Sequence, residues 1–252
     1  MNESKNEIKS TKTALSLLEE LKSRNSAGVT ELAEALDLPK STVFSHLNTL
    51  YKEEYVVREE GRYRLGYKFL EYGEQVRLNS ELQTTARPLL ESLAAETGEL
   101  ANLMVEEFGQ GIYVDLVEGK NAVQVDTYKG KRVDLYCTAL GKAILSQLPE
   151  ERVEEIVDNH PLEPITPNTI TDREELFQEL DEVREQGYAF DDQERAEELR
   201  CIAAPIVSQG EVYGAISVSG PLPRMVGERY QSEIPEQLIN AASVIGINLT
   251  YG

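Results

Sequence analysis

The stretch PKSTVFSHLNTL, residues 39–50, is the feature that most constrains how this chain can fold. Val43, Leu47 and Leu50 are spaced i, i+4 and i+7, which predicts an amphipathic helix with Pro39 at its first position. The opposite face carries short polar groups of the kind that reach phosphates and base edges. These residues alone leave two interpretations: a helix that reads DNA, or an ordinary amphipathic helix with a solvated polar face.

The segments around this stretch favour the first interpretation. An apolar helical pattern covers residues 11–23, and a second short helix follows, for which Thr30 is the predicted N-cap. After the third helix, two β runs at residues 55–58 and 62–65 flank a turn that contains Gly61. Two helices, a tight turn, a third helix and a hairpin are the order of a winged helix-turn-helix, whose last helix enters the major groove.

The residues predicted to contact DNA lie on the third helix and on the hairpin, or wing. They are Lys40, Ser41, Thr42, Ser45, His46, Arg62 and Arg64. Guanidinium groups on a wing suit phosphate or minor-groove contacts, whereas the acidic tip residues Glu59 and Glu60 argue against deep insertion of the tip.

Charge separates a front part of the chain from a rear part. The formal net charge is −20, which is a poor fit to a protein that approaches a polyanion. Residues 1–80 carry 12 basic and 13 acidic groups, whereas the remaining 172 residues carry 13 basic and 32 acidic groups. The acidic excess is therefore confined to the rear part. A lysine-poor, carboxylate-rich surface is also what a high-salt cytoplasm selects, so the composition predicts a halophilic, archaeal source.

Length and composition also predict the number of domains, the compartment and the state of the two cysteines. A chain of 252 residues predicts two domains with a proper core. Without an apolar stretch of membrane-spanning length or a signal-type leader, we expect a soluble, cytoplasmic protein with no membrane partner. Cys137 and Cys201 are expected to be free thiols, with a redox-sensing pair as the alternative.

The rear part alternates helical and strand patterns, which predicts an α+β fold. Expected helices cover residues 85–97, 138–147, 150–159, 172–186 and 235–249, and expected strands cover residues 100–106, 111–117, 122–128, 188–191, 202–207 and 212–219. The predicted division is a DNA-binding domain over residues 1–66, a linker helix over 67–80 and a rear domain over 81–252. The linker helix is either a dimer contact or a connector that packs on its own domain.

Four motifs together resemble the IclR family of transcriptional regulators over almost the whole chain. They are ELAEALDLPKSTVFSHLNTL, YVVREEGRYRLG, LYCTALGKAILSQLP and GYAFDDQERAEELRCIAAPI. Family members often carry Arg at the position of Ser45. The resemblance implies an N-terminal winged helix-turn-helix joined by a linker helix to a GAF-like α/β effector-binding domain, and assembly as a homodimer or a dimer of dimers.

A ligand site is expected where a helix starts near Thr138 and where Ser217 and Ser219 share one face of a strand. The resemblance implies an effector pocket at six positions. They are Ala139, Leu140, Asp191, Cys201, Ser217 and Ser219. The residues alone leave a structural alternative, with backbone-bonded serines, Cys201 as a small buried hydrophobe and Asp191 as a turn acceptor.

The predicted function is a sequence-specific regulator that binds double-stranded operator DNA under the control of a small organic acid. No catalytic residue, metal site or cofactor is predicted, because His46 and His160 lie near no matched motif and no ligand cluster or phosphate loop occurs. Two alternatives remain: an architectural DNA binder that needs no ligand, which requires an evenly basic surface, and an enzyme that processes small acids.

Overall fold

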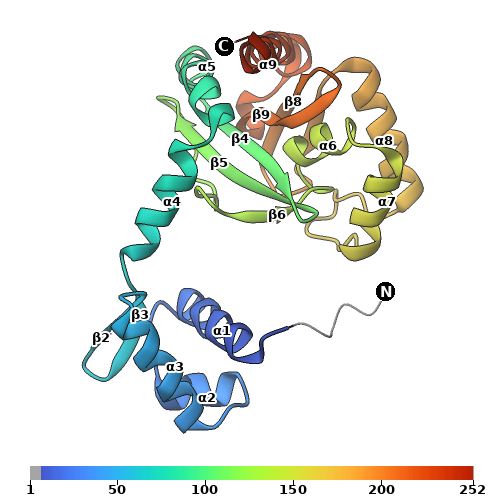
Figure 1. The fold of residues 1–252 in the computed structure, drawn as a ribbon. Coiled ribbons are helices and arrows are strands. Elements are labelled where there is room, and N and C mark those ends of the chain that lie inside the picture. The colour runs from blue at the N-terminus through green and yellow to red at the C-terminus, as the bar shows by residue number, and fades with distance from the viewer. Residues whose placement is uncertain (1–6, 252) are drawn as a thin grey trace. The chain divides into compact units, whose positions relative to one another are not determined.

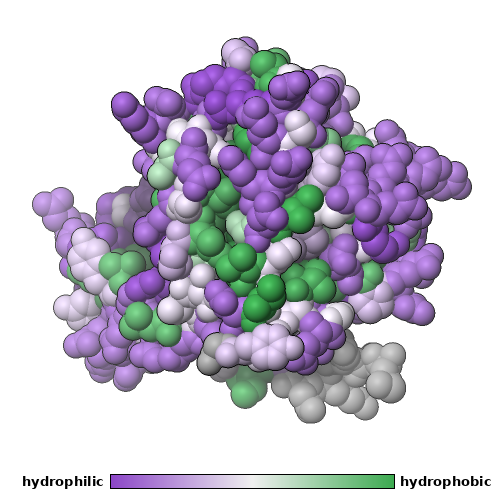
Figure 2. All heavy atoms as spheres, turned by 90° about the horizontal axis from the view of Figure 1, so that it is seen from above, coloured by the Kyte–Doolittle hydropathy of each residue, from purple (hydrophilic) through white to green (hydrophobic). Residues whose placement is uncertain are grey.

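The computed structural model describes residues 7–251. The chain divides into two compact units, one up to Asn79 and one from Ser80 onward, and Figure 1 traces the elements of each. Figure 2 shows one face of the molecule, where most side chains are hydrophilic and hydrophobic ones gather near the middle. In the part of the chain described, no helix is both long and apolar enough to cross a membrane.

The front unit has the element order of a winged helix-turn-helix. Its helices are α1 (Lys9–Arg24), α2 (Val29–Ala35), α3 (Lys40–Lys52) and α4 (Lys68–Leu78). Its strands are β1 (Ala27–Gly28), β2 (Val56–Glu59) and β3 (Arg62–Leu65), paired antiparallel in the order β1-β3-β2. Val43 and Leu47 of α3 are buried against the side chains of α1 and α2, so the predicted inner face of this helix is confirmed.

Two helix starts in this unit differ from prediction. The helix α3 begins one residue after Pro39, whose carbonyl accepts from the N–H groups of Thr42 and Val43. Thr30 is not an N-cap, because α2 already begins at Val29; instead the Glu31 carboxylate accepts the Gly28 N–H at 2.7 Å. Strand β1 was not predicted, since two residues carry no periodic signal.

The rear unit is built on a six-stranded antiparallel sheet in the order β6-β5-β4-β9-β8-β7. The strands are β4 (Leu100–Glu107), β5 (Gln110–Glu118), β6 (Arg132–Asp134), β7 (Ala189–Asp192), β8 (Leu199–Ser208) and β9 (Glu211–Pro221). The helices are α5 (Glu81–Thr97), α6 (Ala139–Leu145), α7 (Glu150–Asn159), α8 (Arg173–Gln186) and α9 (Ile234–Tyr251). A 3-10 turn at Leu222–Arg224 and a π-helical turn at Arg229–Glu233 precede α9.

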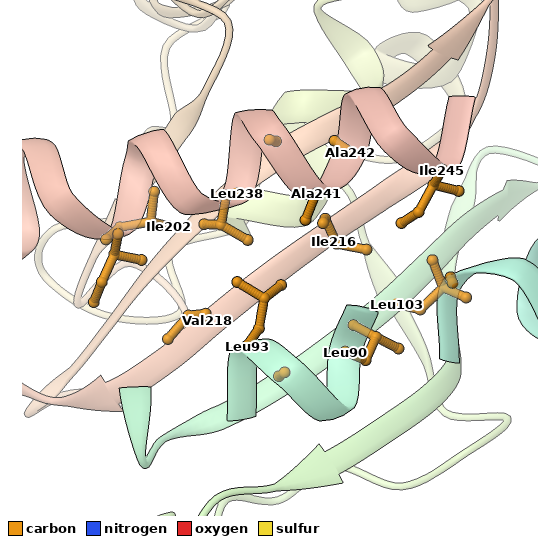
Figure 3. Close-up of a cluster of buried hydrophobic side chains, with 14 of the residues drawn as sticks. Leu90, Leu93, Leu103, Ile202, Ile216, Val218, Leu238, Ala241, Ala242 and Ile245 are labelled. Atoms are coloured by element: carbon orange, nitrogen blue, oxygen red, sulfur yellow. The ribbon is translucent and has the colours of Figure 1, made fainter. Parts of the chain in front are cut away.

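Helices cover both faces of this sheet. Figure 3 shows Leu90 and Leu93 of α5, with Leu238 of α9, directed toward Ile216 and Val218 of the sheet. On the other face, alternate strand residues pack against side chains of α6, α7 and α8. Because strand side chains alternate between faces, β8 and β9 each contribute to both layers. The α+β fold predicted from the sequence is confirmed.

The predicted strand at residues 122–128 is wrong. These residues form a loop, and the edge of the sheet next to β5 is occupied by β6, with Gly111 opposite Val133. Val123 and Val125 are half-buried because they line hollows of the rear unit, not because they alternate across a sheet. A short run of alternating apolar residues therefore imitates a strand here.

Candidate functional site

The rear unit contains a cavity of about 200 Å³ between the sheet and the start of α6. All six residues predicted for the effector site line it: Ala139, Leu140, Asp191, Cys201, Ser217 and Ser219. Six further polar residues that were not among those six also line it: Asn102, Tyr113, Asp126, Thr127, Thr138 and Arg195. The structure thus brings the six predicted residues together, while their part in binding a ligand stays a prediction.

Strand register explains why residues so far apart in sequence meet. Asn102 of β4 is opposite Ser217 of β9, Ser219 is opposite Cys201 of β8, and Cys201 is opposite Asp191 of β7. Directly opposed residues in a sheet point to the same face, so four neighbouring strands present one polar row that steps from Ser217 to Ser219 along β9. This row forms the floor of the cavity.

Asn102 organises the two serines. Its Nδ2 donates to Ser217 Oγ at 3.0 Å and to Ser219 Oγ at 3.1 Å. Each serine hydroxyl therefore accepts from Asn102, and the Ser219 hydroxyl is also a hydrogen-bond partner of the Cys201 thiol. Asn102 is buried, and its Oδ1 has no hydrogen-bond partner among residues 7–251. The structural alternative, in which the serines bond the backbone, does not describe this arrangement.

Asp191 is both a turn acceptor and part of the cavity wall. Its Oδ1 accepts the N–H groups of Glu194 at 2.8 Å and of Arg195 at 3.4 Å. Burial raises the pKa of Asp191 to about 7, and the negative charge of Glu194 adds to the shift. This carboxyl group therefore changes its charge near neutral pH.

Arg195 places a positive charge at the wall of the cavity, which also carries the carboxyl groups of Asp126 and Asp191. Its guanidinium group makes no ion pair with any residue in the described range 7–251, although it lies at the wall beside Asp191. Burial raises the pKa of Tyr113 and of Cys137, the latter to about 12, and the charge of Arg195 opposes both shifts. An unpaired guanidinium beside donor hydroxyls is chemically suited to a carboxylate.

A buried ion pair fixes the turn that carries Asp191 and Arg195. Lys142 of α6 is 1% exposed, and its Nζ lies 2.6 Å from Glu194 Oε1 and 2.9 Å from Glu179 Oε1. The hydroxyl of Thr169 also donates to the Glu194 carbonyl at 2.7 Å. The turn is therefore held from two sides.

The start of α6 closes the cavity. Thr138 caps this helix, and its Oγ1 accepts the Gly141 N–H at 2.9 Å. The absence of a side chain at Gly141 serves packing, because a Cβ there would lie 2.0 Å from the Leu135 carbonyl oxygen. Gly141 itself does not line the cavity.

In the front unit, the residues predicted for DNA contact differ in how accessible they are. Lys40, Ser41 and Ser45 are exposed, whereas Thr42 and His46 are half-buried. Ser45 Oγ donates to the Ser41 carbonyl at 2.9 Å, so its hydrogen is already used within the helix. The sequence analysis did not assign Phe44, because it was not part of the polar pattern.

The wing arginines are paired within the chain. Arg62 lies 3.0 Å from Glu31 and also donates to the Ser26 carbonyl, while Arg64 lies 2.6 Å from Glu59. A phosphate contact by either side chain must therefore replace an existing ion pair.

The described chain offers little to metal or histidine chemistry. Among residues 7–251, no group of three or more His, Cys, Asp or Glu side chains could hold a metal ion. His160 faces Asp134 at 3.6 Å, and it does not line the cavity.

Comparison with known proteins decides the family. An IclR helix-turn-helix domain matches residues 10–60, and a bacterial transcriptional regulator IclR C-terminal domain matches residues 75–247. The chain belongs to the IclR family. It is a DNA-binding transcriptional regulator, and the resemblance found in its sequence motifs is confirmed.

Individual relatives agree in length and fold. The transcriptional repressor IclR of Escherichia coli (strain K12) is 32% identical over 252 residues, which cover 98% of this chain and 91% of that protein. The crystal structure of Thermotoga maritima IclR is similar with a TM-score of 0.77 and 32% identity, over 96% of this chain and 98% of that one. An IclR homologue from Microbacterium hydrocarbonoxydans, complexed with 4-hydroxybenzoate, shares the fold with a TM-score of 0.79 and 23% identity, over 95% of this chain and all of that one.

Proposed function

We propose that this regulator binds operator DNA under the control of a small organic acid held in the cavity of the rear unit. The observation that carries the proposal is the unpaired guanidinium of Arg195 in a small cavity whose floor presents the Ser217 and Ser219 hydroxyls. The complex of a relative with 4-hydroxybenzoate supports an organic acid as the class of ligand. The proposal includes no catalytic step, since neither histidine lies at the cavity.

The experiment compares operator binding with and without candidate acids. Genomic fragments retained by the full chain supply the operator, and a small-acid library screened by thermal shift supplies the ligand. We expect Ser217→Ala with Ser219→Ala to abolish the response to the acid and to leave operator binding intact, while the exposed Ser243→Ala on α9 changes neither. An unchanged response in the double variant would remove both serines from the ligand site.

We propose that the exposed face of α3 reads the major groove. Ser41, Phe44, Ser45 and Asn48 are spaced i, i+3, i+4 and i+7, all are exposed, and this set carries no carboxylate. Lys40 at the helix start, with Thr42 and His46 at its edges and Arg62 and Arg64 on the wing, would contact the backbone of the duplex. Phe44 is 48% exposed, and an aromatic side chain at that place suits the methyl group of thymine.

The proposed contact of Phe44 with a thymine methyl group can be tested by changing either the DNA or the protein. Replacing operator thymines one at a time with deoxyuridine removes only the methyl group. We expect one position to weaken binding about fourfold, the worth of one buried methyl-sized group. In the Phe44→Ala variant, removing the methyl group at that position should no longer weaken DNA binding. In the Ser41→Ala variant it should weaken binding as it does in the wild type. A wild-type protein that binds all deoxyuridine operators equally well contradicts the contact.

We propose a homodimer formed through α4, with a dimer of dimers as the larger assembly. Among its described residues α4 buries none, and it exposes Tyr67 at its start, Leu70 and Leu78. Two heads are needed to engage two half-sites about one helical turn apart. Phe69 and Tyr72 of α4 do pack on Tyr55 of the same unit. The exposed apolar side chains of α4 are nevertheless more consistent with a contact between copies than with a connector that only packs on its own domain.

A further inference from the structure

We infer that a second copy of this chain packs on the outer face of α9, with the two α9 helices antiparallel. The outer face is defined by Asn240, Val244, Ile247 and Tyr251, all of which are exposed. The inference rests on the dimer of dimers proposed above. It assigns the contact that joins the two dimers, in addition to the contact through α4.

The helix α9 is apolar on two sides, and one of them is buried in the rear unit. Figure 3 shows Leu238, Ala242 and Ile245 of this inner side directed toward the sheet. On the outer face, Val244 is 44% exposed and Ile247 is 59% exposed. The four outer residues are spaced i, i+4, i+7 and i+11, the spacing of the seam along which two helices pack in a coiled coil. A helix that only covers a sheet needs one apolar side, so the second side indicates a second contact.

The outer face belongs to a firmly held part of the helix. A Cβ at Gly246 would lie 2.4 Å from the Val207 carbonyl oxygen, so α9 lies directly on β8 at this point. The hydroxyl groups of Ser208 and Thr250 are hydrogen-bonded to each other. Val207 is itself exposed, and it extends the apolar surface beside the helix. Ile247 is therefore exposed on an anchored helix and not on a frayed end.

Charge indicates what covers this face. No residue from Gln237 to Tyr251 is charged, whereas 28% of the whole chain is charged and the rear part has 32 acidic and 13 basic groups. Two rear units therefore repel each other over most of their surfaces. The outer face of α9 lets them meet without bringing carboxylates together, and it offers no ion pair to a basic protein. The surface that matches it is the same face of a second copy, in an isologous contact.

The start of α9 favours an antiparallel pair. Glu236 is exposed there, and parallel helices would place this carboxylate beside its own copy, which is unfavourable. In an antiparallel pair centred between Val244 and Ile247, Val244 faces Ile247 of the second copy, and Asn240 faces Tyr251 of the second copy. Glu236 then lies beyond the end of the opposite helix. The helix dipoles are also favourably opposed in this arrangement.

Substitutions on the outer face test the inference through the mass of the full chain in solution. Val244→Glu with Ile247→Glu places like charges where the copies meet. Neither residue belongs to a buried cluster, so we expect thermal unfolding to be unchanged. Light scattering should give four chains for the wild type and two for this variant over the same range of concentration. The matched control, Phe108→Glu with Ile165→Glu, adds the same charge at exposed apolar side chains outside α9 and should keep four chains.

A charge exchange tests the direction of the helices. In Val244→Glu with Ile247→Lys, each introduced carboxylate faces an introduced ammonium group of the second copy only if the helices are antiparallel. We expect this variant to hold four chains down to concentrations about tenfold lower than the double glutamate variant does, the effect of a close charge pair across an interface. Equal dissociation of the two variants would overturn the antiparallel pairing.

The outcomes separate this inference from the proposed contact through α4. If the double glutamate variant keeps the mass of the wild type, or if the control loses mass as well, the inference is wrong and the dimer through α4 stands. If the wild type contains two chains and only the substitutions on α9 reduce it to one, the contact through α9 stands and the contact through α4 is wrong.

Discussion

Asp191 shows how a single buried carboxyl group sets a pH dependence. Its pKa is raised to about 7 in the folded chain, first by burial and then by Glu194, while an unfolded aspartate titrates near pH 4. The folded state therefore binds the proton more tightly than the unfolded state does. Its stabilising effect is complete below about pH 4 and is lost as the pH rises through about 7.

We expect Asp191→Asn to be more stable than the wild type at pH 8, by up to about 4 kcal/mol, because a shift of about three pKa units corresponds to that free energy. The asparagine carbonyl can still accept the Glu194 N–H. At pH 4 the two proteins should differ little. Urea unfolding between pH 4 and pH 8 measures the difference, and parallel curves for the two proteins would contradict the assignment.

At the scale of single residues, sequence analysis identified the groups that belong to motifs and missed those that complete the site in three dimensions. Ser217 and Ser219 stand two apart on one strand, which is visible in the sequence. Asn102 is opposite Ser217 across a strand pair separated by more than a hundred residues, and only the register brings them together. Arg195 is one charge in an acidic turn, so its lack of a partner could not be predicted.

Among the elements, α6 and the turn after β7 are coupled by Lys142. Burial disfavours the charged form of this lysine, yet its pKa is raised because Glu194 and Glu179 both lie within 3 Å. Removing the lysine leaves Glu194, which is 7% exposed, without its counter-charge. Removing one partner of a buried ion pair is far more destabilising than replacing both partners with well-packed apolar residues.

Lys142→Met should therefore lower the free energy of unfolding by about 3–5 kcal/mol. Adding Glu194→Gln to this variant should recover part of the loss, because the unpaired buried charge is gone. Urea unfolding of the wild type, the single variant and the double variant measures both effects. Equal stability of the two variants would show that Glu194 finds another partner.

Elements with long periodic patterns were predictable, and irregular ones were not. The helix α7 is found over the predicted residues, and Gly98 ends α5 in the left-handed conformation that its sequence position indicates. Residues 122–128 form a loop where a strand was predicted, and β6 was missed because three residues give no periodicity. Which segment pairs with the free edge of β5 depends on tertiary contacts, so the pairing of β6 could not be predicted from the local sequence.

The assembly of the whole molecule should depend on α4. Leu70 is 67% exposed and Leu78 is 62% exposed, which is costly for an isolated helix. We expect Leu70→Glu with Leu78→Glu to give a smaller folded assembly whose operator binding falls at least tenfold, while binding of the acid is unchanged. Light scattering measures the mass of the assembly, and titration measures the affinities for operator DNA and for the acid. A double variant with the wild-type mass would exclude α4 as the contact.

The charge of the whole chain predicts a dependence on salt. With 45 acidic and 25 basic side chains, repulsion within the folded state is strong in dilute buffer and is screened at high ionic strength. We expect the free energy of unfolding to rise between 0.1 and about 2 M KCl, where the Debye length falls below about 3 Å. Stability that does not change with salt would contradict the prediction of a halophilic source.

The cavity takes its floor from the sheet and its charged wall from the turn after β7. The floor is part of the scaffold, so altering it risks the fold, whereas a turn can change in length and composition at little cost. Under the proposed function, new ligand preferences can therefore arise by changing this turn while the DNA-binding unit and the sheet stay the same. Grafting the corresponding turns of relatives onto this chain would then be a direct way to build sensors for other small acids.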